Sequence, residues 1–412
     1  MGWDAGRTVG RMVADTAIPL RPALVGSAPW RVAAVAFAGY ALFLGGLWYA
    51  HGIEGFIHFG RAFVTHSDRS RVITPNLQID NRVGYDGQFY YAIAADPANA
   101  RYYMKGPGFT YSRIVYPMAA RALALGRPAA VPYTLVAINL AAVAMAVFAL
   151  AIWLRRRRTS TWLALLYALY PGLAFCMYRD LTEPLAFTFA ICGAVVFDGR
   201  GRHARWAAAA LFALAALTRE TTVLFPAVYA AASLLEGRGS LGARLRANAL
   251  RAGAFAAVAL LPLLVDRIAF RLWLGSSTVE SGPRSIWPFA GLAAWWPWTT
   301  THWLIVLAVV LPALAWTGAA TVSLLRDAAA PELWLLLANV LVFVVFLPKP
   351  IDVEYGSAAR ACCGVVAAAI LSVPALDRAL AGGRRMRPLL LLAWSPLWYA
   401  AASIAAIALA RS

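Results

Sequence analysis

The stretch of sequence best suited to chemistry is polar and aromatic, and it runs from Asp80 to Tyr91. Asp80 and Asp86 stand six residues apart, and Tyr85, Gln88 and Tyr91 lie beside them. Carboxylates and amides bind sugar hydroxyls, and aromatic faces cover the apolar side of a sugar ring. A carboxylate within hydrogen-bond reach of a hydroxyl can also act as a general base. The stretch therefore contains the parts of a sugar-binding site, in which either carboxylate could serve as base.

From the residue pattern alone, a structural role for Asp86 is favoured over a catalytic one. It precedes Gly87 and a helix-compatible run, 88–95, which stops before Pro97. An aspartate in that place can cap a helix by accepting hydrogen bonds from free backbone amides. Capping and catalysis do not exclude one another, so both remain open for Asp86.

Two further clusters of charged residues interrupt apolar stretches. The first contains Arg179, Asp180 and Glu183, and the second contains Arg219 and Glu220. Ionisable groups at membrane depth are costly, so they usually face a cavity or a partner. A substrate site is one explanation. The alternatives are helix capping in the first cluster and a mutual ion pair or interfacial position in the second.

A fourth cluster follows a long apolar run and includes Lys349, Asp352, Glu354, Tyr355 and Arg360. Arginine binds phosphate oxygens through two parallel hydrogen bonds, and lysine supplies a point charge. The cluster would suit a lipid-linked phosphate, although an ordinary solvated loop would have a similar composition.

The composition identifies the elements that must position these residues. The chain has 412 residues, of which 61% are hydrophobic and 14% charged, with a formal charge of +18. Soluble domains have about 25% charged residues, so this chain needs lipid as a solvent. Its basic residues lie mostly in short segments between apolar runs, which fits the positive-inside rule better than nucleic-acid binding.

The apolar runs predict an all-α polytopic membrane protein with about eleven transmembrane helices. The stretch 206–235 is interpreted as two short spans, with a single tilted helix as the alternative. The other expected spans are 31–50, 131–154, 160–177, 184–198, 252–274, 303–325, 332–347, 358–376 and 389–410.

The Arg-rich short loops predict the orientation, because this threading places them all on one side. The N-terminus is then cytoplasmic, without a cleavable signal peptide, and residues 51–130 form a large first loop outside. That loop carries the acidic motif and short amphipathic helices, one of them near 114–125. Residues 1–412 are expected to form a single transmembrane domain with no separate soluble domain.

The cysteines and histidines do not predict a zinc site. The four cysteines, Cys176, Cys192, Cys362 and Cys363, lie in or beside apolar spans and form no metal-binding spacing. The five histidines also lack such spacing.

The stretch Val83 to Tyr91, followed by Asp96 and Pro97, resembles bacterial GT-C type membrane glycosyltransferases. Those enzymes carry an acidic motif in a large outer loop directly after the first span. The segment 217–221 is similar to the basic segment that they carry between short middle spans.

This resemblance implies a GT-C-like fold in a bacterial cytoplasmic membrane, with the active site facing outside. It also implies a polyprenyl-phosphate-linked sugar donor and a cell-envelope glycan, lipid or protein as acceptor. Asp86 would be the catalytic base, with Asp80 as the competing candidate, and Arg179, Arg219, Lys349 and Arg360 would bind phosphate. A divalent cation, Mg or Mn, is a possible cofactor.

On the same basis, three acidic residues would shape the pocket or bind a metal: Asp180, Glu183 and Glu220. Two other classes of function stay open. A transporter or flippase of a lipid-linked glycan would need charges along both halves of the bundle, and a non-catalytic assembly subunit would need no acid in a cleft.

Overall fold

The structure is a computed structural model, and it describes residues 27–66, 79–80, 83–104, 106–199, 201–237, 239–279, 287–326, 330–347, 354–379 and 392–411. Within these ranges the chain is a helical bundle with one small parallel pair of strands, β1 (Phe59–Gly60) and β2 (Ile79–Asp80). Lys349 and Asp352 lie outside the described residues. For Asp80 the structure gives the backbone alone, opposite Gly60 in the strand pair.

Four helical segments are long and apolar enough to cross a membrane. They are α2 (Pro29–His51), the segment Pro128–Arg156 formed by η4 (Pro128–Ala130) and α8 (Val131–Arg156), α14 (Leu241–Leu274), and Thr300–Leu325. The last combines α16 (Thr300–Ile305), the π-helical turn η7 (Val306–Val310) and most of α17 (Leu311–Arg326). An all-α membrane protein is therefore confirmed in outline.

Two bent helix pairs raise the number of candidate spans to six if each pair counts as one. One pair joins Thr161–Ala168, made of η5 (Thr161–Ala164) and α9 (Leu165–Ala168), to α10 (Pro171–Tyr178) at a bend of 52°. The other joins α19 (Tyr355–Ala361) to α20 (Cys363–Ala379) at 43°. Pro171 explains the first break, because proline cannot donate the backbone hydrogen bond that would continue the preceding helix.

Several of the remaining expected spans are helices of 10–17 residues, so the described chain gives four to six spans by length instead of about eleven. These apolar helices are α11 (Glu183–Phe197), His203–Thr218 within α12 (Arg202–Thr218), Pro331–Val345, and α22 (Pro396–Leu409). Pro331–Val345 consists of α18 (Pro331–Val340) and the π-helical turn η8 (Leu341–Val345).

The stretch 206–235 is two helices and not one. Helix α12 ends at Thr218, a 3₁₀ turn η6 (Glu220–Val223) follows, and α13 (Leu224–Leu234) begins at Leu224. Arg219 has extended backbone angles, φ −158° and ψ 122°, which end the helix. The break therefore falls at the charged residues that interrupt the apolar run.

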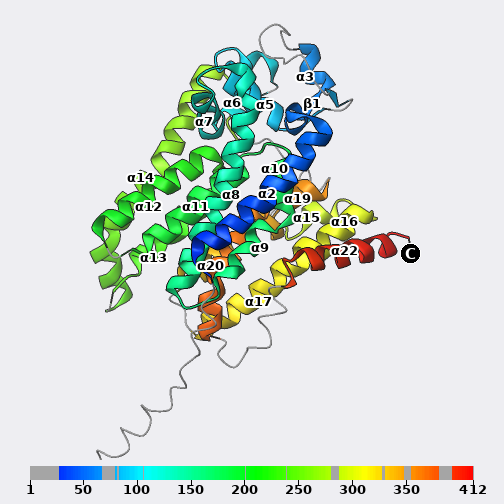
Figure 1. The fold of residues 1–412 in the computed structure, drawn as a ribbon. Helices are drawn as coiled ribbons and strands as arrows, with labels where there is room; N and C mark the ends of the chain where they lie inside the picture. The colour runs from blue at the N-terminus through cyan, green and yellow to red at the C-terminus, as the bar shows by residue number, and fades with distance from the viewer. Residues whose placement is uncertain are drawn as a thin grey trace, which may run out of the picture.

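The first loop folds into short helices at one end of the bundle, at the top of Figure 1. These are η2 (Ile53–Phe56), α3 (Arg61–His66), α5 (Gly87–Ala95), η3 (Ala100–Tyr103), α6 (Pro107–Tyr111) and α7 (Val115–Leu123). Helix α7 contacts α8 and α12, and α6 contacts α14. The loop is therefore packed onto the ends of the long helices. A further short helix, α15 (Ala290–Ala293), precedes α16.

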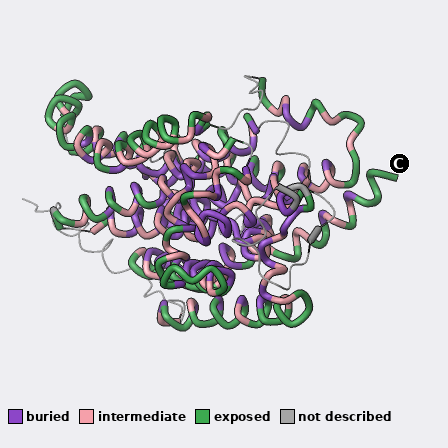
Figure 2. The backbone as a smooth tube through the Cα atoms, turned by 90° about the horizontal axis from the view of Figure 1, so that it is seen from above, coloured by how far each residue is buried: buried purple, intermediate pink, exposed green. Residues whose placement is uncertain are grey.

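The core runs through the middle of the bundle, where buried residues concentrate, while exposed residues follow the outer helices (Figure 2). Helix α8 lies between α2 and α11 and contacts both. Large aromatic groups fill this core, and two of them place their polar tips on backbone carbonyls: Tyr40 donates to the Ala168 carbonyl at 2.6 Å, and Trp153 donates to the Leu371 carbonyl at 2.9 Å. Such pairing removes the cost of burying a polar tip.

Candidate active site

Asp86 lies at the start of α5, in the first loop. It occupies the N-cap position of α5, but its side chain makes no capping hydrogen bond. The carboxylate instead accepts a hydrogen bond of 2.9 Å from Nη1 of Arg360, near the end of α19. The side chain of Asp86 is 32% exposed, so a ligand can reach it. Asp86 therefore occupies the position of a helix cap, but its carboxylate is used for a contact with Arg360.

Gly87 allows the start of α5 to approach the chain around Arg179. A Cβ atom at this position would collide with the backbone carbonyl oxygen of Arg179. Only glycine therefore permits this contact without a shift of one of the two segments. The contact joins the first loop to the turn between α10 and α11.

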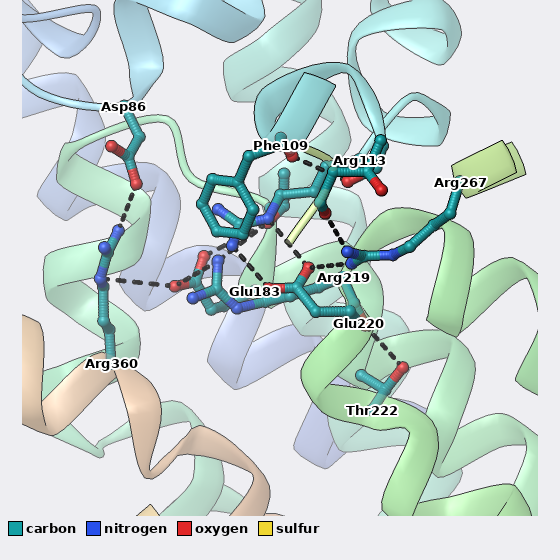
Figure 3. Close-up of polar contacts among 12 residues, drawn as sticks. Asp86, Phe109, Arg113, Glu183, Arg219, Glu220, Thr222, Arg267 and Arg360 are labelled. Carbon is teal, nitrogen blue, oxygen red and sulfur yellow. Dashed lines mark hydrogen bonds and ion pairs between the residues drawn. The ribbon is translucent and has the colours of Figure 1, made fainter. Parts of the chain in front are cut away.

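Glu183 is the centre of a chain of ion pairs beneath Asp86. It is completely buried in the first turn of α11, and Arg219 approaches its Oε1 at 3.2 Å and Arg360 at 3.8 Å. Thr182 also accepts a hydrogen bond of 3.4 Å from Arg219. Arg360 thus bridges Asp86 and Glu183 (Figure 3).

Glu220 forms a second chain of ion pairs at the break between α12 and α13. Arg113 donates two hydrogen bonds to its carboxylate, at 2.7 and 3.0 Å, and Arg267 of α14 lies 3.7 Å away. Arg113 also donates to the Tyr90 hydroxyl at 3.1 Å. Arg219 and Glu220 therefore pair with other residues and not with each other. Because the two are neighbours in sequence, the two chains of ion pairs meet at this break (Figure 3).

Arg179 stands beside these chains without an ion pair to a described residue. Its guanidinium lies 5.1 Å from the ring centres of both Tyr85 and Tyr178 and 5.5 Å from that of Phe175. Arg360 also lies over the Tyr85 ring, at 5.1 Å. Cation–π contacts hold a guanidinium in place while leaving its N–H donors available.

The structure brings most of the predicted residues together. We call this group of side chains the arginine–carboxylate cluster. Its members that were predicted from sequence are Tyr85, Asp86, Arg179, Glu183, Arg219, Glu220 and Arg360, and Arg113 and Arg267 complete it. Tyr355 packs its ring against Tyr399 at 5.1 Å, outside these ion pairs.

Gln88 and Tyr91 lie in the packing below the loop. The Gln88 amide is fully engaged, since its oxygen accepts from Gly60 at 2.9 Å and its nitrogen donates to Val83 at 3.0 Å. Tyr91 is 1% exposed and packs edge-on against Phe59. Both side chains therefore support the loop that carries Asp86.

Asp180 is buried in the turn between α10 and α11, and neither of its carboxylate oxygens has a hydrogen-bond partner among the described residues. Its φ of +48° places its backbone in the left-handed region, which costs energy for a residue other than glycine. Burial raises the pKa of the Asp180 carboxyl well above its usual range. Burial thus favours the neutral form of the Asp180 carboxyl over the charged form.

Two arginines of the cluster, Arg113 and Arg267, were not among the site residues predicted from the sequence. Arg113 is only 4% exposed, although long loops usually hold their arginines in water. Arg267 lies within the apolar run 252–274, next to Asp266. An ionisable residue inside a span is a signal of a site or a partner, so Arg267 was accessible to sequence reasoning. Arg113 gave no comparable signal.

The electrostatics of the cluster favour an anionic ligand. Burial would raise the pKa of Asp86, but the guanidinium groups of Arg360 and Arg113 outweigh that effect and hold the pKa of the carboxyl below its usual range. In the two chains of ion pairs, four arginines face three carboxylates, and Arg179 adds a further positive charge beside them. The cluster therefore carries a surplus of positive charge.

The donor set does not fit a divalent cation. Asp86, Glu183 and Glu220 are each already paired with arginine, whereas Mg²⁺ and Mn²⁺ need carboxylate oxygens free to ligate. Among the described residues, no three His, Cys, Asp or Glu side chains gather closely enough to hold a metal.

Comparison of this chain with protein-family models, with curated proteins and with solved structures gives no match.

Proposed function

We propose that this protein is a membrane glycosyltransferase of GT-C-like fold that transfers a sugar from a polyprenyl-phosphate carrier to a hydroxyl of a cell-envelope acceptor. The observation that carries the proposal is the contact of Asp86 with Arg360. It places a reachable carboxylate next to an arginine cluster whose charge suits a phosphate. Those are the two groups that such a reaction needs, a base for the acceptor and a cation for the leaving group.

The reaction is a single displacement. The acceptor oxygen forms a bond to the anomeric carbon while the bond from that carbon to the phosphate oxygen breaks. The acceptor proton passes to Asp86, and the electron pair of the broken bond stays on the phosphate. Arg360, Arg219 and Arg179 stabilise the charge that develops there. Such a displacement inverts the anomeric centre.

Arg360 connects the two halves of this mechanism. Without a ligand it lowers the pKa of Asp86, which weakens the carboxylate as a base. A phosphate that binds Arg360 competes for the same guanidinium and reduces its hold on Asp86. The carboxylate would thus become more basic once the donor is in place.

The donor is tested by mass spectrometry of lipids that the purified protein retains, before and after incubation with a panel of polyprenyl-phosphate sugars. The proposal predicts that the carrier is retained and that it loses its sugar when an acceptor is supplied. Carriers that remain bound and unchanged with every acceptor would favour a flippase. A protein that binds none of the carriers would contradict the proposal.

A further inference from the structure

A cavity of about 480 Å³ lies at the opposite end of α12 from the arginine–carboxylate cluster. Three helices enclose it. Arg205 and Trp206 come from the start of α12, Ser233 and Glu236 from the end of α13, and Asn248, Arg251 and Phe255 from the first half of α14. Arg205 and Arg219 are about 21 Å apart along α12, at 1.5 Å per residue. The cavity is therefore a separate site.

The polar wall of the cavity is preorganised. Arg205 donates to both oxygens of Glu236, at 2.7 and 2.9 Å, and to Ser233 at 3.4 Å. Asn248 donates to the backbone carbonyl of Glu236 at 2.9 Å and thereby ties α14 to the end of α13. These contacts fix the shape of the rim without any ligand.

Arg251 is the basic group of the cavity that remains available. It is exposed and makes no hydrogen bond or ion pair to a described residue. One turn further along α14, Phe255 is 3% exposed and packs against Phe197 and Phe212, at ring distances of 5.4 and 6.1 Å. The cavity thus combines the cationic side chain of Arg251 at its rim with the apolar ring of Phe255 at its base.

An apolar track continues from this floor along the surface of α14. Val258 and Val265 follow Arg251 and Phe255 at helical spacing, so the four share one stripe of the helix. Val258 is 42% exposed and Val265 62%. Because α14 is long enough to span a membrane, the exposed valines of this stripe would face lipid in a bilayer. A ligand with a charged head and a long apolar tail matches the whole surface.

We propose that this cavity binds the phosphate headgroup of an anionic phospholipid. Arg251 would hold the phosphodiester, Trp206 and Phe255 would cover the glycerol and the first acyl carbons, and the chain would follow the Val258–Val265 stripe. The lipid would fix α14, whose far end supplies Arg267 to Glu220 at 3.7 Å. The proposal does not depend on the reaction proposed above.

The test is a titration of the full-length protein in detergent with short-chain phosphatidylglycerol and with phosphatidylcholine of the same chain length, read by native mass spectrometry. Arg251→Gln is compared with Arg246→Gln, an exposed arginine of the same helix that donates to the Gly242 carbonyl at 3.3 Å. Size-exclusion profiles check that both variants fold. Loss of a charge-assisted contact predicts about tenfold weaker phosphatidylglycerol binding for R251Q alone.

Three results would overturn the proposal. Equal binding of the two lipids would remove the role of lipid charge, and equal losses in the two variants would show unspecific attraction to a basic surface. Displacement of the lipid by inorganic phosphate or a nucleotide at similar concentrations would identify a soluble anion as the ligand.

Discussion

Arg360 joins Asp86 of the first loop to Glu183 of α11, with a hydrogen bond of 2.9 Å to the first and an approach of 3.8 Å to the second. One side chain from the C-terminal part of the chain thus connects a partly exposed carboxylate to a buried one. In the proposed mechanism, Arg360 therefore both lowers the pKa of Asp86 and positions the phosphate of the donor.

Replacement of Arg360 by glutamine should move the acidic limb of the pH–rate profile to higher pH. Burial raises the pKa of Asp86 and Arg360 lowers it. Removal of the Arg360 guanidinium should therefore raise the pKa of Asp86. The base must be ionised, and activity is therefore lost at a higher pH in the variant. The control is Arg127→Gln, which replaces an exposed arginine of the loop that carries Asp86 and should leave the profile unchanged. An unshifted limb in R360Q would contradict the assignment of Asp86 as base.

Arg113 and Glu220 should show strong energetic coupling. The side chain of Arg113 is 5% exposed, so removal of Glu220 leaves a buried cation without its ion-pair partner, at a cost of about 3 kcal/mol. A double-mutant cycle of R113A and E220A, measured by unfolding in detergent, should find much less destabilisation in the double variant than in the sum of the single ones. The exposed pair Arg205–Glu236, with both side chains 43% exposed, should couple by less than about 1 kcal/mol. Similar coupling in both pairs would be evidence against this account.

Asp180→Asn should stabilise the protein at neutral pH. The pKa of Asp180 is raised in the folded state by burial, so folding above the ordinary pKa of aspartate requires uptake of a proton. This cost grows as pH rises toward the folded pKa, and asparagine avoids it. We expect a gain of about 1 kcal/mol at pH 7 and little gain at pH 4. Asp198→Asn, which removes a partner of Arg157 at 2.9 Å, should give no such gain. A pH-independent effect of D180N would contradict the raised pKa of Asp180.

Gly87→Ala should disrupt the approach of α5 to Arg179, because the new Cβ meets a backbone carbonyl that has little freedom to move. The displaced α5 would carry Asp86 with it, and transfer should fall together with thermal stability. Gly46→Ala in α2 is the matched control, since a Cβ there meets nothing within 4 Å. Alanine in a helix interior is favoured over glycine by about 0.5–1 kcal/mol, so G46A should be neutral or stabilising. Equal stability of G87A and G46A would show that the close approach does not matter.

The sequence predicted the helical membrane architecture because apolar composition and span length are local properties. It also located the break at Arg219, where charged residues interrupt the run 206–235. The expected count of about eleven spans is not confirmed, because by length and composition the described residues give four to six candidate spans and several other apolar helices have only 10–17 residues. Helix α11 begins at Glu183 and α12 ends at Thr218, next to Arg219, so a charged residue of the cluster lies at one boundary of each helix.

The pairings within the cluster were not predictable from sequence. Arg219 and Glu220 are neighbours and invited the interpretation of a mutual ion pair, yet their partners are Glu183 and Arg113. Which side chains meet depends on how the first loop packs on the helices, and this is a tertiary property. For the same reason Gln88 looked like a sugar ligand, although both ends of its amide bind the loop backbone.

The most direct test of the proposed chemistry is single-turnover sugar transfer by Asp86→Asn, compared with wild type and with Asp96→Asn in the same loop. Asp96 bonds Asn99 at 2.9 Å and lies outside the arginine–carboxylate cluster. Loss of a general base predicts a rate about 10²–10⁴-fold lower in D86N, with donor retention preserved and D96N close to wild type. Transfer at the wild-type rate in D86N would contradict the account and remove Asp86 from the mechanism.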